Sequence, residues 1–260
     1  MSRTNRVAVI TGGAQGIGRR TAEVLAERGF HIALIDLRAP DATVQAVEQL
    51  GSQALSFTGD ITDGSLVDLF ANCVYETFGR ADVLVNNAGI SLISPAEETT
   101  AAQYRRVMEV NLVAPFLLAR AFGQKMLAAR RGSIINIASV AGLVAISDRA
   151  AYNASKHGLI GLTRTLAAEW GGRGVRVNAV CPGWVKTEMD VADQLGGSYS
   201  DADITGRVPM ARFATPDDVA RAIAFLADEN ESAFINGHTL SVDGGWASDG
   251  SWESVRLSKR

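Results

Sequence analysis

The chain has 260 residues, 47% of them hydrophobic, and a formal net charge of −3, so it can bury a full core in one α/β domain. No block of like charges marks a surface for nucleic acid or an anionic membrane, and the apolar run after Arg6 is too short for a signal or membrane-spanning segment. Two cysteines and three scattered histidines lack metal-ligand spacing, so we expect a cytoplasmic protein that binds no metal, nucleic acid or membrane.

Short β-branched runs alternate with longer helical patterns through most of the chain. Continuous apolar strands of this kind are typical of a parallel sheet that is covered by helices on both faces. The sequence therefore predicts an α/β fold with one doubly wound, seven-stranded parallel sheet in residues 1–245, and ligands at the carboxyl ends of its strands. The predicted strands are 6–11, 31–36, 54–60, 81–87, 132–139, 175–182 and 237–245.

A glycine-rich turn, "TGGAQGIG" at 11–18, follows the first strand. Gly12, Gly16 and Gly18 would let the backbone turn tightly and approach a pyrophosphate, whose charge the next helix N-terminus favours. Such a turn alone can also be a tight connection without a ligand. Asp36 supports the ligand, because it ends the second strand where it can accept hydrogen bonds from an adenosine ribose. Together these residues predict a dinucleotide-binding Rossmann fold.

The charge of Asp36 indicates which dinucleotide binds. A 2′-phosphate at ~4 Å from the carboxylate, at an effective dielectric of ~20, would meet a repulsion of ~4 kcal/mol, roughly a thousandfold in affinity. Arg38, two residues further on, could instead reach a phosphate, although we expect it to form a surface ion pair or to be solvated. The prediction is NAD.

The stretch "DRAAYNASKHG", 148–158, places Tyr152 and Lys156 one helical turn apart on one face. An ordinary tyrosine with a pKa of ~10 is only about 0.1% ionised at pH 7, and a neighbouring ammonium can lower that pKa. Tyr152 is therefore predicted to be a general acid or base, and Ser139, at the end of its strand, to hydrogen-bond the substrate oxygen. Singly, such residues are more often an exposed helical pair and a helix cap.

The glycine turn, "NNAG" at 86–89, Asn111, Ser139 and Tyr152 with Lys156 together resemble the short-chain dehydrogenase/reductase family, from Arg6 to about Gly245. The resemblance implies a homotetramer whose catalytic residues are Asn111, Ser139, Tyr152 and Lys156, with Asn111 holding a water that connects the lysine to solvent. It also implies that Asn86 braces the sheet. The cofactor-binding residues expected from the motifs and the resemblance are Gly12, Gln15, Gly16, Ile17, Gly18, Asp36, Asp60, Ile61, Asn87, Ala88, Gly89, Tyr152, Lys156, Pro182, Gly183, Val185 and Thr187.

The segment from Trp184 to about Phe213 is predicted to be a helical substrate lid with glycine hinges at 196 and 197. Its mixed composition favours a small polar substrate. Ser139, Tyr152 and Trp184 are expected to contact that substrate, with Arg207 and Arg212 as further candidates to bind an anion.

Arg149 would point over the reacting centre if the helix of Tyr152 already runs there. "KHG" at 156–158 and "CPGWVKT" at 181–187 are similar to bacterial 3-hydroxybutyrate dehydrogenases, where a lysine at this position binds the substrate carboxylate. Arg149 is thus predicted to bind an anion, with an ion pair to Asp148 or an interface contact as the alternative. Ser91 and Ala141 replace polar residues of those enzymes, which argues against 3-hydroxybutyrate itself.

The sequence as a whole predicts an NAD-dependent oxidoreductase that acts on a secondary alcohol or sugar hemiacetal. Its substrate would be a small hydroxy compound, either a carboxylic or sulfonic acid or a sugar or polyol. A 3-oxoacyl-[acyl-carrier-protein] reductase is the alternative enzyme, although Asp36 and Gln15 do not fit its usual NADPH, and an inactive NAD-sensing protein is the alternative outside enzymes. The tail, 246–260, is expected to be disordered or to dock on a neighbouring subunit.

Overall fold

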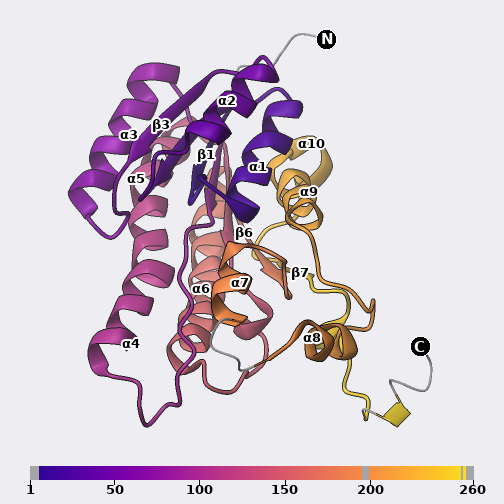
Figure 1. Ribbon diagram of the computed structural model, residues 1–260. Coiled ribbons are helices and arrows are strands. Elements are labelled where there is room, and N and C mark those ends of the chain that lie inside the picture. Colours follow the sequence, from indigo (N-terminus) through magenta and orange to yellow (C-terminus); the bar gives the residue numbers. More distant parts are fainter. Residues whose placement is uncertain (1–5, 195–198, 253, 256–260) are drawn as a thin grey trace.

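The computed structural model describes residues 6–194, 199–252 and 254–255, and its centre is one parallel sheet in the order β3-β2-β1-β4-β5-β6-β7 (Figure 1). This arrangement confirms the predicted doubly wound fold. The chain winds outward from β1 to β3 and then returns to β4, so the strand order reverses between β1 and β4. The strands are β1 (Val7–Thr11), β2 (His31–Asp36), β3 (Ala54–Thr58), β4 (Val83–Asn86), β5 (Gly132–Ile137), β6 (Val175–Pro182) and β7 (Thr239–Val242).

Helices cover both faces of the sheet (Figure 1). One face packs against α1 (Gly16–Glu27), α2 (Asp41–Gln49) and α9 (Pro216–Ala227), and the other packs against α3 (Gly64–Phe78), α5 (Ala114–Ala129) and α6 (Ala150–Trp170). In β1, Ala8 and Ile10 face the first layer while Val7 and Val9 face the second. Because both faces are buried, the strands are continuously apolar and not alternating.

Side-chain caps and a buried amide pair fix the positions of the elements around the site. Asp63 caps α3, and Thr215 forms a reciprocal capping box with Asp218 at the start of α9. Asn86 on β4 lies opposite Asn136 on β5 and donates to its side-chain oxygen at 2.8 Å. The prediction that Asn86 braces the sheet agrees with this contact, because a buried amide must be hydrogen-bonded.

The α4 helix (Ala101–Met108), the π-helical turn η1 (Glu109–Val113) and α5 form one continuous helical stretch. By length and apolar content residues 101–129 could cross a membrane, but the core helix of a globular protein satisfies the same criterion. Within α5, Leu118, Phe122 and Met126 are buried in the core cluster against the sheet. The α5 part of the stretch therefore packs as a core helix, whereas Val107 is the one buried residue of α4.

The predicted lid lies between β6 and α9 and contains α7 (Glu188–Gln194) and α8 (Asp201–Arg207). The backbone N–H of Ala214 donates to Trp184 O at 2.9 Å, and that of Lys186 donates to Ala214 O at 3.2 Å, so the two ends of the segment are joined. The predicted glycine hinges, Gly196 and Gly197, lie outside the described residues. The shorter helical elements elsewhere are η2 (Val140–Gly142), η3 (Gly171–Arg173), α10 (Glu229–Ser232) and η4 (Trp246–Ser248).

The described part of the C-terminal tail packs on the lid of the same chain. The Trp246 ring in η4 lies 4.9 Å from the Trp184 ring, centroid to centroid, and the Arg207 guanidinium lies 4.9 Å from the Trp246 ring. Arg207 also donates to Asp249 O at 2.8 Å. The start of the tail is therefore ordered on its own subunit, whereas Trp252 is 83% exposed.

Candidate active site

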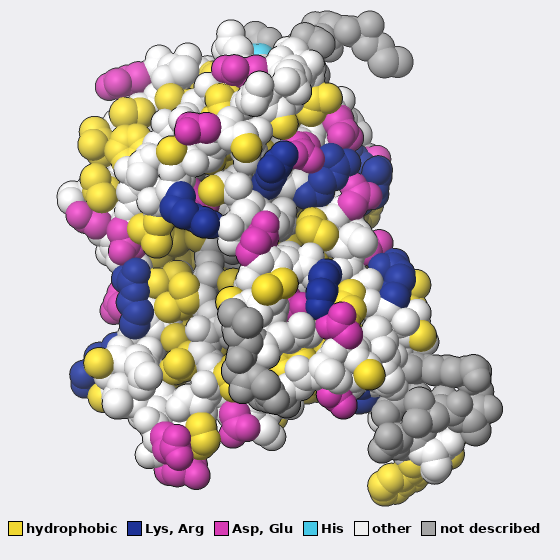
Figure 2. All heavy atoms as spheres, viewed as in Figure 1, with side chains coloured by type: hydrophobic (Ala, Val, Ile, Leu, Met, Phe, Trp, Pro, Cys, Tyr) yellow, Lys and Arg dark blue, Asp and Glu magenta, His cyan; other side chains and the backbone are white. Residues whose placement is uncertain are grey.

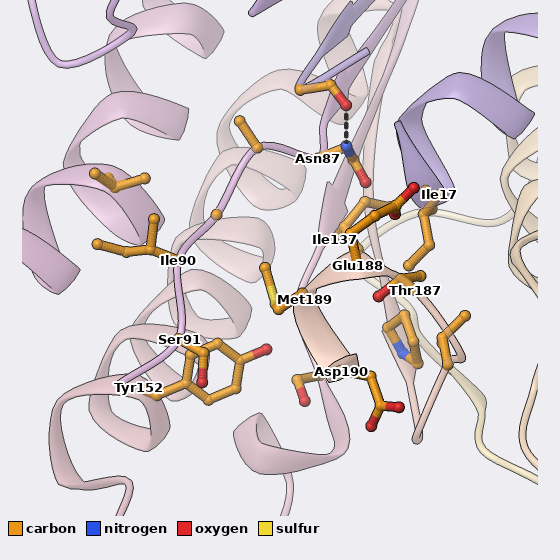
Figure 3. A pocket seen from close by; sticks show the side chains of 18 of the residues that line it. Ile17, Asn87, Ile90, Ser91, Ile137, Tyr152, Thr187, Glu188, Met189 and Asp190 are labelled. Carbon is orange, nitrogen blue, oxygen red and sulfur yellow. Dashed lines mark hydrogen bonds between the residues drawn. The ribbon is translucent and has the colours of Figure 1, made fainter. Parts of the chain in front are cut away.

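A cleft of about 370 Å³ opens at the carboxyl ends of the strands, where the strand order reverses. Figure 3 shows the cleft at close range, with Ser91 and Tyr152 on one side and Thr187, Glu188, Met189 and Asp190 on the other. In Figure 2 cationic and acidic side chains are interspersed on this side of the molecule. The predicted site residues that line the cleft are Gly12, Gln15, Gly16, Ile17, Asp36, Asp60, Ile61, Asn87, Ala88, Gly89, Ser139, Arg149, Tyr152, Lys156, Pro182, Gly183, Trp184, Val185 and Thr187.

The glycine turn is packed too closely for side chains. Gly12 has a φ of +69°, and a Cβ on it would lie 2.9 Å from the Ala88 Cα. A Cβ on Gly18 would lie 2.0 Å from Gly12 O, so Gly18 serves the packing of helix on strand and is not a lining residue. The Gln15 side chain makes no capping hydrogen bond at the start of α1. The first N–H groups of α1 are thus not capped by it, which fits a pyrophosphate group.

Asp36 is held in place at the end of β2. Its Oδ2 accepts from the Ala14 N–H at 2.9 Å, and its Oδ1 accepts from the Arg38 N–H at 3.0 Å. The Arg38 guanidinium is exposed and donates to the Gln15 side chain, so of the two expected states the solvated one fits better than the ion pair. Arg38 also lines the cleft, so the Asp36 carboxylate and the exposed Arg38 guanidinium both lie at the end of the cleft next to β2.

Tyr152 and Lys156 lie one turn apart in α6, as predicted, but the net shift of the Tyr152 pKa is opposite to the expected one. The buried Lys156 Nζ donates to Ile137 O at 2.8 Å and lies 5.6 Å from the Tyr152 ring centroid. Burial lowers the pKa of Lys156 to about 8. Burial also raises the pKa of Tyr152 above its usual value, against the smaller lowering effects of its Ser139 hydrogen bond and the Arg149 charge. The net effect of the residues present is thus to raise the phenol pKa, and the expected lowering by the lysine stays a prediction.

Asn111 lies behind the cleft, in the π-helical turn η1, and is fully buried. Its side chain accepts from the Ile90 N–H and donates to Ile90 O, each at 2.9 Å, and it donates to Ser155 Oγ at 3.1 Å. A Cβ on Gly89 would lie 3.2 Å from Asn111 Oδ1 and 3.5 Å from Lys156 Nζ. Gly89 thus adjoins both side chains and leaves them close together. Single π-helical turns of this kind are frequent at functional sites.

Arg149 reaches the cleft by a route that the sequence did not indicate. The α6 helix begins at Ala150, so the helix does not yet run at Arg149, which is its N-cap residue. Asp148 has a φ of +58° and its carbonyl accepts from the Ser94 N–H at 2.8 Å. The Arg149 guanidinium then donates to Ser91 Oγ at 2.7 Å and to Asp193 Oδ2 at 3.0 Å. Its ion-pair partner is therefore Asp193 of α7 and not the adjacent Asp148.

Arg207 and Arg212 are not among the described residues that line the cleft. Arg212 forms an ion pair at 2.7 Å with Asp218, the residue that completes the capping box of α9. Arg207 packs on the ring of Trp246 in the tail. The prediction that these two arginines contact substrate is corrected by this placement, because both charges serve contacts elsewhere.

Five lid residues in the cleft were not singled out from the sequence: Glu188, Met189, Asp190, Asp193 and Tyr199. The Tyr199 hydroxyl donates to Asp190 Oδ1 at 3.2 Å, and Asp190 is 7% exposed. Burial and the nearby carboxylates raise the pKa of Tyr199 to about 12. The spacing of Asp190 and Asp193, three apart in a helical pattern, was a usable signal, because such residues share a face.

Comparisons with known proteins cover nearly the whole chain. A family model described as enoyl-(acyl carrier protein) reductase matches residues 12–247. The chain is 42% identical to the D-threitol dehydrogenase of Mycolicibacterium smegmatis over 243 residues, which are 93% of this chain and 92% of that protein. It is 39% identical to the 2-(S)-hydroxypropyl-CoM dehydrogenase 3 of Xanthobacter autotrophicus over 247 residues, 93% of this chain and 96% of that one.

A solved structure adds a likeness in three dimensions. It is a putative NAD(P)-dependent gluconate 5-dehydrogenase from Beutenbergia cavernae with NADP bound at low occupancy. That structure matches with a TM-score of 0.88 at 41% identity, and the match covers 94% of this chain and 97% of the other.

Proposed function

The chain belongs to the short-chain dehydrogenase/reductase family of nicotinamide-dependent oxidoreductases, and on that premise we propose that it oxidises a secondary alcohol of a small polyol or sugar with NAD⁺. The reverse reaction would reduce the matching carbonyl with NADH. The observation that carries this proposal is one cleft that holds Ser139, Tyr152 and Lys156 together with the glycine turn and Asp36. Two relatives support a polyol substrate: one is named D-threitol dehydrogenase and the other galactitol 2-dehydrogenase.

Two residues would act on the substrate oxygen directly. The Ser139 hydroxyl would hydrogen-bond that oxygen and hold the reacting carbon in place. Because burial keeps the pKa of Tyr152 high, its phenol stays protonated at neutral pH and can donate to a carbonyl oxygen during reduction. In oxidation the phenol must first lose its proton, which a positive charge beside it favours. A bound nicotinamide would supply the hydride acceptor or donor.

Lys156 and Asn111 would serve proton transfer from behind Tyr152. With its pKa at about 8, Lys156 is mostly charged at neutral pH and changes its charge just above it. Its Nζ is anchored on Ile137 O, and Gly89 leaves it beside the Asn111 side chain. We assign this pair the role of passing the proton of Tyr152 towards solvent.

The preference for NAD over NADP rests on Asp36. Its carboxylate lines the cleft at the end of β2, where a 2′-phosphate would meet its negative charge. Arg38 at the same end is the residue that could offset this repulsion. We also propose that the protein is a cytoplasmic homotetramer, as the family resemblance implies.

An acyl-carrier-protein reductase is the second candidate, because the matching family model bears that description and a 3-oxoacyl-[acyl-carrier-protein] reductase of Synechocystis is 37% identical. The acidic residues Asp190 and Asp193 of the lid argue against an acyl chain, which needs an apolar wall. An inactive NAD-sensing protein is a third reading, although the four expected catalytic residues are all present.

The test is NAD⁺ and NADP⁺ reduction with a panel of tetritols, pentitols, hexitols, aldoses and hydroxy acids. Tyr152→Phe should lower kcat by about 10²–10⁴-fold and leave NADH binding, followed by fluorescence, within a few fold. Tyr104→Phe, on the surface of α4, is the matched control and should keep full activity. Ordinary turnover by Tyr152→Phe would show that the mechanism is wrong. If the wild type turned over no alcohol at all, the result would favour the inactive NAD-sensing protein over the enzyme.

A further inference from the structure

The guanidinium of Arg149 is already paired with a carboxylate. Its Nη1 bonds both Ser91 Oγ, at 2.7 Å, and Asp193 Oδ2, at 3.0 Å. Ser91 also donates to Asp193 Oδ2 at 3.1 Å, so the three side chains form a closed triangle. The side chains of the ion pair are 11% and 18% exposed, which screens it less than a surface pair. Arg149 therefore does not present an unbalanced positive charge to the cleft.

The triangle joins different elements across the substrate end of the cleft. Arg149 precedes α6, Ser91 follows β4, and Asp193 comes from the lid helix α7. Asp190, one turn before Asp193, lines the same cleft and accepts from the Tyr199 hydroxyl. The lid thus contributes two carboxylates to the lining of the cleft that holds Tyr152, and Figure 3 shows Asp190 across the cleft from Tyr152.

Besides Arg149, two lysines lie near this part of the cleft, and neither supplies a free cation for an anionic substrate. Lys156 is buried and its Nζ is bound to Ile137 O. Lys186 has a side chain that is 42% exposed, and it pairs with Asp190 at 3.2 Å and with Asp201 at 2.6 Å. Lys186 is not among the described residues that line the cleft.

We infer that Asp193 makes this cleft selective for neutral polyhydroxy compounds and against hydroxy acids, because it occupies the guanidinium that would otherwise bind a carboxylate. The inference rests on the proposed function and specifies the substrate class of that same site. It replaces the expectation that Arg149 is an anion clamp.

The chemistry of the triangle suits hydroxyl groups. Carboxylates only accept hydrogen bonds and guanidinium only donates them, whereas each substrate hydroxyl can do both. A polyol can therefore bridge Asp193 and Arg149 without adding charge. A substrate carboxylate at ~4 Å from Asp193 would meet a like charge worth up to roughly a thousandfold in affinity at an effective dielectric of ~20. Since the cleft is partly open to solvent, screening reduces this factor, and we expect a preference of at least tenfold for the neutral substrate.

The experiment compares kcat/KM for polyols and for hydroxy acids of equal carbon number, such as xylitol with xylonate, in the wild type and in Asp193→Asn. The substitution keeps the shape and removes the charge. The wild type should prefer the neutral partner at least tenfold, and Asp193→Asn should move that ratio at least tenfold towards the acid. Adding Arg149→Met to Asp193→Asn should abolish the gain, because the released cation is then lost. Asp201→Asn, which removes a lid carboxylate outside the cleft, is the matched control.

The outcomes separate the inference from the function. A wild type that oxidises hydroxy acids as well as polyols, or a ratio that Asp193→Asn leaves unchanged, overturns the inference while the oxidoreductase function stands. Failure to oxidise either class overturns the proposed function and this inference with it. Asp193→Ser is a second variant should Asp193→Asn not fold, and NADH binding with a thermal melt verifies the fold of each.

A pH profile gives a readout that a purely structural role would not change. Asp193 raises the pKa of Tyr152 and Arg149 lowers it, while burial, Ser139 and Cys181 act on the same phenol. Lys156 adjoins the Tyr152 ring as well. Without the Asp193 charge the effect of Arg149 is no longer opposed, so the rise of polyol oxidation with pH should begin at lower pH. An unshifted profile would contradict the pairing.

Discussion

The charge of Asp36 gives the sharpest prediction, that Asp36→Asn moves the cofactor preference towards NADP. The carboxylate is fixed by two backbone N–H groups, of Ala14 at 2.9 Å and of Arg38 at 3.0 Å. Because it cannot readily turn away, a 2′-phosphate at the end of β2 would lie beside it. Asparagine keeps one oxygen acceptor for these two N–H groups and removes the charge.

The magnitude follows from Coulomb's law with solvent screening. One unit of like charge at ~4 Å and an effective dielectric of ~20 is worth ~4 kcal/mol, or roughly a thousandfold. Asp36 is half-buried and Arg38 is exposed, so water and salt reduce this figure. We expect Asp36→Asn to change the ratio of kcat/KM for NAD⁺ to that for NADP⁺ by about 10- to 1000-fold.

The assay is steady-state NAD⁺ and NADP⁺ reduction with one saturating alcohol, together with Kd values for NADH and NADPH. Arg38→Ala in the Asp36→Asn background should then reduce NADPH affinity, because it removes the guanidinium at that end of the cleft. The reasoning is refuted if the wild type uses both cofactors equally or if Asp36→Asn leaves the ratio unchanged. Asp41→Asn, at the start of α2, controls for removal of a nearby carboxylate.

Three further predictions concern proton transfer, packing and the tail. Because the pKa of Tyr152 is raised, its base form grows with pH, so alcohol oxidation should rise between pH 7 and 10 while carbonyl reduction stays level; rates of both directions across pH check this. Gly18→Ala puts a Cβ 2.0 Å from a carbonyl oxygen of the glycine turn and should cost about 1–3 kcal/mol and several degrees of Tm, with weaker NADH binding, whereas an unchanged melt would contradict the packing. Trp246→Ala should raise substrate KM about 2- to 10-fold with unchanged NADH affinity, because it removes a ring contact with the cleft residue Trp184. Trp252→Ala, which is largely exposed, is its control, and equal effects of both would argue against lid support.

Much of the cofactor end was predictable because its signals are local. Gly12 and Gly16 follow β1 within a few residues and Asp36 ends β2, and parallel strands bring such ends to one edge of the sheet. Tyr152 and Lys156 lie one turn apart on a single helix, so their proximity needed no tertiary information. The pKa of Tyr152 could not be predicted in the same way, because it depends on burial by distant segments.

The substrate end was less predictable because its contacts join distant segments. The partner of Arg149 lies 44 residues later in the chain, and the adjacent Asp148 was the nearer candidate in sequence. Arg207 and Arg212 have the right charge for an anion site, but their ring and ion-pair partners, Trp246 and Asp218, direct them away from the cleft.

The sequence by itself determined the doubly wound fold class, the glycine turn, the acid that ends β2 and the Tyr152–Lys156 pair, because periodicity and short spacings encode them. The tertiary structure alone decided which charges are balanced. A lid helix brings Asp193 to Arg149, burial raises the pKa of Tyr152, and the tail packs on Trp184. Charge balance and desolvation depend on distances between side chains that are far apart in sequence, and only the folded chain sets those distances.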